Sequence, residues 1–155
     1  MSESASFDFN AFIKESKETL LNPKAYFSVM KTSGGMGEPV LKALIYSVIA
    51  GVIVFLWGII GLSGQAGIFG AGIGVMALIW TIIGAMIGLF IGAVIVLIIS
   101  ALCKGNTDFE ACLRVVASLM VLFPVTAILG FITGISPVIG SIIALCVNLY
   151  GLYLL

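Results

Sequence analysis

The chain has 155 residues, of which 61% are hydrophobic and 9% are charged, and its mean hydropathy is +1.29. Soluble domains carry about 25% charged residues, so this composition excludes an ordinary soluble protein and indicates a single-domain integral membrane protein. Seven basic and seven acidic side chains give a formal net charge of zero, which gives no reason to expect a nucleic-acid partner.

The chemistry available to the chain is narrow. Histidine is absent, which removes the commonest metal ligand and the side chain that titrates near neutral pH. The cysteines Cys103, Cys112 and Cys146 contain no CxxC pair and predict neither a zinc site nor a disulfide framework. We therefore expect no metal and no cofactor.

Residues 1–38 hold most of the charged side chains and are expected to form a cytoplasmic segment without a secretory signal. Apolar residues recur at helical spacing from Phe9, and Asn22-Pro23 predicts the start of a second short helix, which Gly34-Gly35 would end. Two amphipathic helices ahead of a membrane span are expected to lie along the cytoplasmic membrane surface. Docking to a partner protein is the alternative.

Residues 39–155 are predicted to form an all-α, polytopic transmembrane helix bundle. Four spans are expected, at about residues 40–62, 75–102, 111–133 and 137–155. The stretch 67–102 has two interpretations, one span with a glycine-rich lead-in or two short spans. A single span places all seven basic residues on the cytoplasmic side, as the positive-inside rule favours.

Glycines at four-residue spacing predict a helix-packing interface. Gly84, Gly88 and Gly92 would lie on one helix face, where a second helix can approach closely, and Gly130 with Gly134 repeats the spacing. Glycine is also common in membrane helices generally, which is the simpler explanation. Whether the neighbouring helix belongs to this chain or to another copy stays open.

A charged cytoplasmic loop interrupts the hydrophobic part of the chain. Its notable residues are Lys104, Thr107, Asp108, Phe109, Glu110 and Arg114. Thr107 and Glu110 have the spacing of a capping box, and Glu110 can pair with Arg114 one helical turn later. This structural interpretation explains every charge except that of Lys104, and we prefer it to a functional site.

Three further residues predict local features of the last two spans. Pro124 is expected to bend the third span, because proline removes a backbone hydrogen bond. Ser136 followed by Pro137 predicts the start of the fourth span. Asn148 is expected to form a hydrogen bond to a neighbouring helix.

Several short stretches follow one another in a characteristic order. They are Asn22-Pro23-Lys24-Ala25-Tyr26-Phe27, the loop Lys104-Gly105 with Phe109-Glu110 and Leu113-Arg114-Val115-Val116, then Pro124, then Ile135-Ser136-Pro137-Val138-Ile139-Gly140. This order resembles the Yip (Ypt-interacting protein) domain family of small polytopic membrane proteins. The resemblance covers most of the chain from Asn22 onward.

The resemblance implies a five-span domain with a cytoplasmic N-terminus and one further helix beyond Leu155. Eukaryotic relatives act in traffic between endoplasmic reticulum and Golgi and bind Rab-type GTPases through a long N-terminal region. Here that region is short and contains no acidic-aromatic Gly-Pro motif, so we do not expect a Rab-type GTPase partner. The resemblance thus points to the prokaryotic branch, to the cytoplasmic (inner) membrane, and to no catalytic residue.

Three functions are compatible with these features. The first is a non-enzymatic scaffold or accessory subunit, which packs by its glycine faces against itself or other membrane proteins and contains no buried charge. The second is an oligomeric channel or transporter component, although no charged residue lies between Lys42 and Lys104 and the charges of Glu110 and Arg114 lie at one rim. An intramembrane enzyme is the third, and the spans offer no acid, base or nucleophile arrangement for it.

Overall fold

The computed structural model describes residues 9–60 and 70–154, and all regular secondary structure in these residues is α-helical. The helices are α1 (Phe9–Leu21), α2 (Pro23–Val29), α3 (Gly37–Ile60), α4 (Gly70–Leu102), α5 (Phe109–Leu119), α6 (Leu122–Ile135) and α7 (Pro137–Leu154). The predicted all-α bundle is therefore confirmed. The predicted ends of the first and fourth spans, at residues 61–62 and 155, lie outside the described residues.

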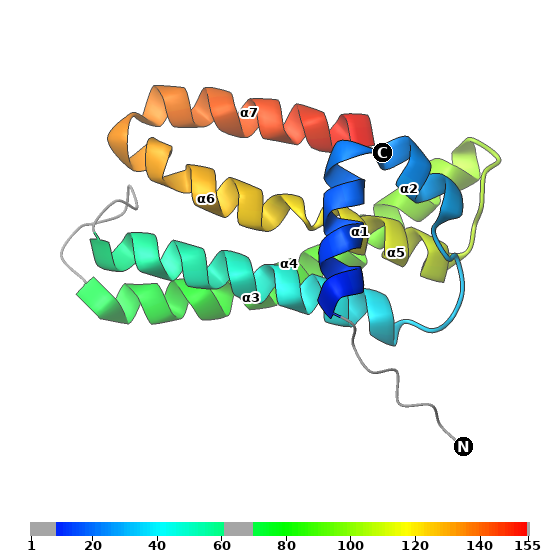
Figure 1. Cartoon of the computed structure of the whole chain (residues 1–155), viewed down its shortest axis with the longest axis horizontal. Coiled ribbons are helices and arrows are strands. Elements are labelled where there is room, and N and C mark those ends of the chain that lie inside the picture. The colour runs from blue at the N-terminus through cyan, green and yellow to red at the C-terminus, as the bar shows by residue number, and fades with distance from the viewer. Residues whose placement is uncertain (1–8, 61–69, 155) are drawn as a thin grey trace, which may run out of the picture.

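The long helices α3, α4, α6 and α7 run side by side, and α1 crosses them near one end of the bundle (Figure 1). Three apolar stretches are long enough to cross a membrane, namely Gly37–Ile60, Leu78–Leu102 and Phe109–Ile135. Helix α7, with 18 residues, is about 27 Å long at about 1.5 Å per residue and is slightly shorter than a typical hydrocarbon core. The arrangement with four spans stays a prediction.

Residues 70–102 form one continuous helix of 33 residues rather than two short ones. The helix begins at Gly70, whereas the predicted span begins at Val75, so the described part of the glycine-rich lead-in is helical as well. At about 1.5 Å per residue, α4 is about 50 Å long, which exceeds a hydrocarbon core of about 30 Å.

Small residues bring α3 and α4 together. Ala43 and Ala50 of α3 and Ala85 and Ala93 of α4 are buried, and Leu89 between the two α4 alanines is fully buried. Alanine allows two helix backbones to approach closely, and this increases the dispersion contacts that stabilise helix pairs in lipid. The interior of the bundle therefore uses the alanine face of α4 and does not use Gly84 or Gly88, which are exposed.

The third apolar stretch is divided by a tight turn at Met120 and Val121, which separates α5 from α6. Pro124 has no amide hydrogen, and its ring would clash with the carbonyl of residue 120 in a regular helix. The amide of Phe123 instead donates to the Met120 carbonyl at 2.9 Å, a one-residue tighter turn. The distortion expected from Pro124 is thus present, and it lies one turn before the proline.

The connection between α6 and α7 is a single residue, Ser136, whose extended backbone (φ −145°, ψ 105°) suits the position before Pro137. So short a connection forces the two helices together. A Cβ atom at Gly140 would lie 2.6 Å from the Cα of Thr133, whereas a Cβ at Gly130 would meet nothing within 4 Å. Gly140 is therefore the glycine that this crossing requires.

Replacing Gly140 should test this close approach. We expect Gly140→Ala to destabilise the protein by about 1–3 kcal/mol, because the new methyl group overlaps the α6 backbone. Gly130→Ala is the matched control and should leave the midpoint of thermal unfolding in detergent unchanged or slightly raised. Equal effects of the two substitutions would contradict the tight α6–α7 crossing.

Candidate functional site

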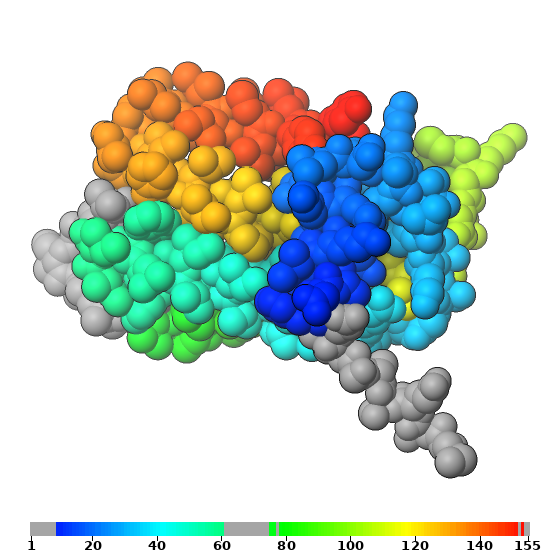
Figure 2. Space-filling view, viewed as in Figure 1, coloured from blue at the N-terminus to red at the C-terminus, as the bar shows by residue number. Residues whose placement is uncertain are grey.

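The N-terminal arm, defined here as residues 9–36, packs against the spanning helices at one end of the bundle (Figures 1 and 2). Phe12 of α1 is 6% exposed and packs against Tyr46 of α3 in a tilted arrangement, with ring centroids 4.9 Å apart. The hydroxyl groups of Ser16 and Tyr46 share a hydrogen bond of 2.6 Å. The opposite end of the chain contributes as well, since Tyr150 of α7 donates to the Leu20 carbonyl.

Part of the apolar surface of α1 faces away from the protein. Phe9, Ile13 and Leu21 are between 50% and 71% exposed. Because α1 crosses the long helices at their charged end, this surface can lie in the membrane interface while Phe12 holds the helix to the bundle. The interfacial position expected for the amphipathic segment stays a prediction, as does the alternative of docking to a partner protein.

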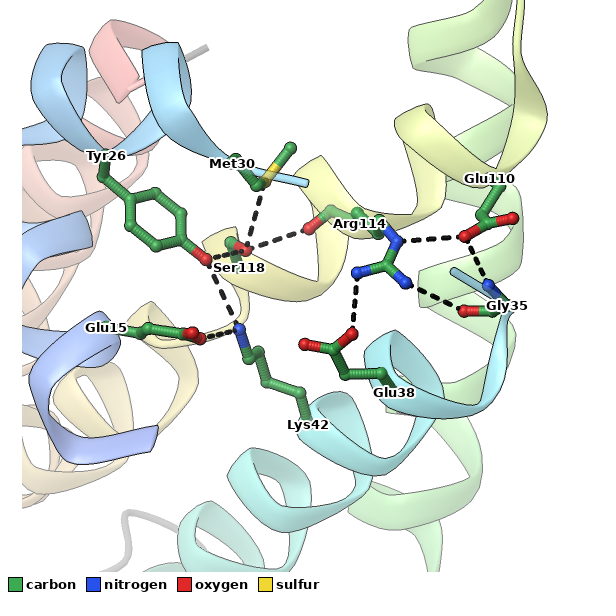
Figure 3. A network of polar contacts seen from close by, with 9 residues as sticks. All are labelled: Glu15, Tyr26, Met30, Gly35, Glu38, Lys42, Glu110, Arg114 and Ser118. Atoms are coloured by element: carbon green, nitrogen blue, oxygen red, sulfur yellow. Dashed lines mark hydrogen bonds and ion pairs between the residues drawn. The ribbon is translucent and has the colours of Figure 1, made fainter. Parts of the chain in front are cut away.

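Lys42 of α3 is buried where α1 and α2 cross the bundle (Figure 3). Its ammonium group forms an ion pair with Glu15 of α1 and donates to the hydroxyl of Tyr26 of α2 at 3.3 Å. The Tyr26 hydroxyl in turn shares a hydrogen bond of 2.9 Å with Ser118 of α5. One buried cation thus connects four helices.

Arg114 of α5 is the second buried cation, with 6% of its side chain exposed. Its guanidinium group donates to Glu38 at 2.8 Å, to Glu110 at 3.1 Å and to the Gly35 carbonyl at 3.1 Å. The Gly35 amide also donates to Glu110 at 2.7 Å. Arg114 therefore joins α5 to the start of α3 and to the end of the N-terminal arm.

The turn before α3 is shaped to fit this arginine. Gly34 and Gly35 both have positive φ angles, +135° and +97°, in the region that L side chains rarely adopt. A Cβ atom on Gly34 would lie 3.2 Å from the Arg114 guanidinium group. The expected glycine turn is therefore present, although α2 ends earlier, at Val29.

A polar cavity of about 230 Å³ lies between the two cations. Its lining carries three carboxylates, Glu15, Glu18 and Glu38, beside Lys31, Lys42 and Arg114. The buried donors on Lys42 and Arg114 are already bonded to protein oxygen atoms. This arrangement is suited to fixing helices relative to one another, because its two buried cations pair with carboxylates of the chain itself.

The charged loop contains the predicted Glu110–Arg114 pair, which is confirmed at 3.1 Å. The predicted capping residue was wrong: the N-cap is Asp108, whose carboxylate accepts from the Glu110 amide at 3.0 Å, and not Thr107. Lys104 has a φ of +56° and ends α4, with its amide donating to Ala101 and that of Gly105 to Ser100. The unexplained Lys104 is therefore a helix-terminating residue.

The predicted absence of buried charge was wrong, because Lys42 and Arg114 are both buried. The sequence separates Lys42 from Glu15 by 27 positions and Arg114 from Glu38 by 76, so no helical spacing connects them. Two lone cations at the ends of predicted spans were the available signal, since such charges require partners. Asn148 was also predicted wrongly, since its amide donates to Ala144 of its own helix.

The predicted packing glycines fall into two groups. A Cβ at Gly92 would lie 3.0 Å from the Val116 side chain of α5, so this glycine packs within the chain. At Gly84, Gly88 and Gly130 a Cβ would meet nothing within 4 Å among the described residues. Gly134 is exposed in the last turn of α6.

Removing the buried arginine should show how much the site stabilises the fold. We expect Arg114→Gln to destabilise the protein by about 1–3 kcal/mol, because Glu110, whose side chain is 20% exposed, loses its ion-pair partner and the Gly35 carbonyl loses a hydrogen bond. The control is Lys14→Gln, which removes a pair separated by 4.0 Å whose side chains are 77% and 47% exposed, and which should cost less than about 1 kcal/mol. Similar losses of unfolding free energy in both variants would contradict a structural role for Arg114.

Comparison with protein families matches residues 17–155 to the Yip1 domain. No curated protein and no solved structure matches the chain. The matched region begins within α1 and includes the second helix of the arm, all the long apolar helices and both buried cations. The chain therefore belongs to the Yip1 domain family, and its long apolar helices are those of an integral membrane protein.

Proposed function

We propose that the protein is a non-enzymatic scaffold or accessory subunit that assembles with other membrane proteins or with copies of itself. The observation that carries this proposal is the open face of α4 at Gly84 and Gly88. Both glycines are exposed, and neither meets a described neighbour within 4 Å of a Cβ position. A strip without side chains lets a second helix approach almost to backbone contact.

Helix α4 has one buried face and one exposed face, and this difference supports the proposal. Ala85, Leu89 and Ala93 are buried in the bundle, so the contacts within the chain do not use the two exposed glycines. A helix gains no stability from glycine in its interior and loses roughly 0.5–1 kcal/mol relative to alanine. An intermolecular contact would offset that cost.

The charged site supports a structural role as well. Its buried cations form ion pairs with Glu15, Glu38 and Glu110. General acid–base chemistry needs a group that can exchange protons with a substrate within hydrogen-bond reach. Side chains already committed to connecting helices fit a scaffold better than an active site.

We further propose that the charged end faces the cytoplasm of a prokaryotic cell. The basic residues lie in the N-terminal arm, at the start of α3, in the α4–α5 connection and in α5, and these elements gather at one end of the bundle (Figure 1). Basic residues favour the cytoplasmic side of a bilayer.

Filling the open face should separate assembly from folding. We expect Gly88→Leu to fold with an unchanged melting temperature, because the new side chain enters open space, yet to lose self-association or co-purifying membrane proteins. Size-exclusion chromatography and mass spectrometry of co-purified proteins measure both outcomes. The contrasting variant is Gly51→Leu, which should reduce stability because even an added Cβ atom would lie only 3.4 Å from the Leu78 side chain.

If Gly88→Leu keeps the parent's oligomeric state and the same co-purifying proteins, the open face is not an assembly surface. An Ile95→Leu variant on the exposed side of α4 supplies the neutral reference.

A further inference from the structure

A second cavity, of about 480 Å³, lies on the other side of α2 from the polar one. It is bounded by α2, the last turns of α4, the first half of α5 and the end of α7. Tyr26 of α2 is directed toward Ser118 and Lys42, while its neighbour Phe27 lines this second cavity. The volume lies within the range of about 300–1,000 Å³ that is usual for ligand pockets.

The lining of this cavity is amphipathic. Phe27, Val96 and Val115 provide apolar walls from three different helices, and Lys24, Ser100 and Asn106 add polar groups. A ligand that satisfies both parts must combine hydrocarbon with a polar, anionic group.

The position of the cavity along α4 identifies the region of the bilayer that it meets. Val96 and Ser100 lie in the last two turns of the apolar stretch that ends at Leu102. At about 1.5 Å per residue, Val96 is about 9 Å deeper than Leu102. The cavity therefore extends from the headgroup region into the upper acyl-chain region, where only lipid is abundant.

Charge sets this cavity apart from the polar one. Its lining includes one charged side chain, Lys24, and no carboxylate. Lys24 forms no ion pair with any of the described residues, in contrast to Lys42 and Arg114. A headgroup that carries its own cation would find no acidic partner here, so a net negative headgroup is favoured.

We propose that this cavity binds one anionic glycerophospholipid from the surrounding leaflet, with its phosphate at Lys24 and an acyl chain along Val96 and Val115. The buried hydrogen bond of 2.9 Å between Tyr26 and Ser118 fixes α2, and with it Lys24 and Phe27, over the cavity. The lining of the cavity includes neither Gly84 nor Gly88, so lipid binding can be tested separately from assembly through the glycine face.

Native mass spectrometry of the purified full chain in detergent tests the proposal. The protein is titrated separately with dioleoylphosphatidylglycerol and dioleoylphosphatidylcholine. We expect one tightly bound phosphatidylglycerol, and Lys24→Gln should lower its affinity about fivefold, since one interfacial lysine contributes about that much. Lys14→Gln, whose side chain is 77% exposed on α1, is the matched control and should keep the parent affinity.

Two variants that fill the cavity and one competing anion, inorganic phosphate, complete the experiment. Val96→Trp on α4 and Val115→Trp on α5 fill the cavity from two different helices, and each variant that keeps the parent's circular dichroism spectrum should bind less of both lipids. Excess inorganic phosphate should not displace the phospholipid, because it lacks the acyl chain. Equal binding of the two lipids by the parent, equal effects of the two lysine substitutions, or displacement by phosphate would each overturn the proposal.

Discussion

Two buried cations determine how the N-terminal arm lies against the membrane helices. Removing a charge from water costs several kcal/mol, so Lys42 and Arg114 are tolerated only where hydrogen-bonding partners surround them. For Lys42 these partners are Glu15 and Tyr26, and both belong to the arm. The arm is therefore an integral part of the fold, because it both covers Lys42 and supplies the two groups that pair with its charge.

The same ion pairs make the two cavities on either side of α2 different in charge. On one side, carboxylates of the chain neutralise the buried cations, and the polar cavity there is an internal network. On the other side, Lys24 lies beside apolar walls in a cavity whose lining includes no carboxylate. Helix α2 thus lies between a cavity whose buried cations pair with carboxylates of the chain and a cavity for which we propose a lipid ligand.

The sequence predicted the helical class, the amphipathic arm and the short-range pairing of Glu110 with Arg114, because each of these follows from composition or helical spacing. It did not predict the partners Glu15 and Glu38, since tertiary folding alone brings them to the cations. Asp108 replaced Thr107 as the cap because the helix begins one residue later than the capping box required. The glycine pattern on α4 could not distinguish Gly92, which packs within the chain, from Gly84 and Gly88, which are open.

The central claim is that the arm is fixed to the bundle and does not move freely over the membrane surface. Pulsed electron paramagnetic resonance measures this most directly, with one spin label at position 14 of α1 and one at position 128 of α6, both at exposed side chains, in liposomes and in a background without the native cysteines. The structure predicts a single narrow distribution of distances between the two labels. A broad distribution, as for a helix that diffuses over the lipid surface, would contradict it.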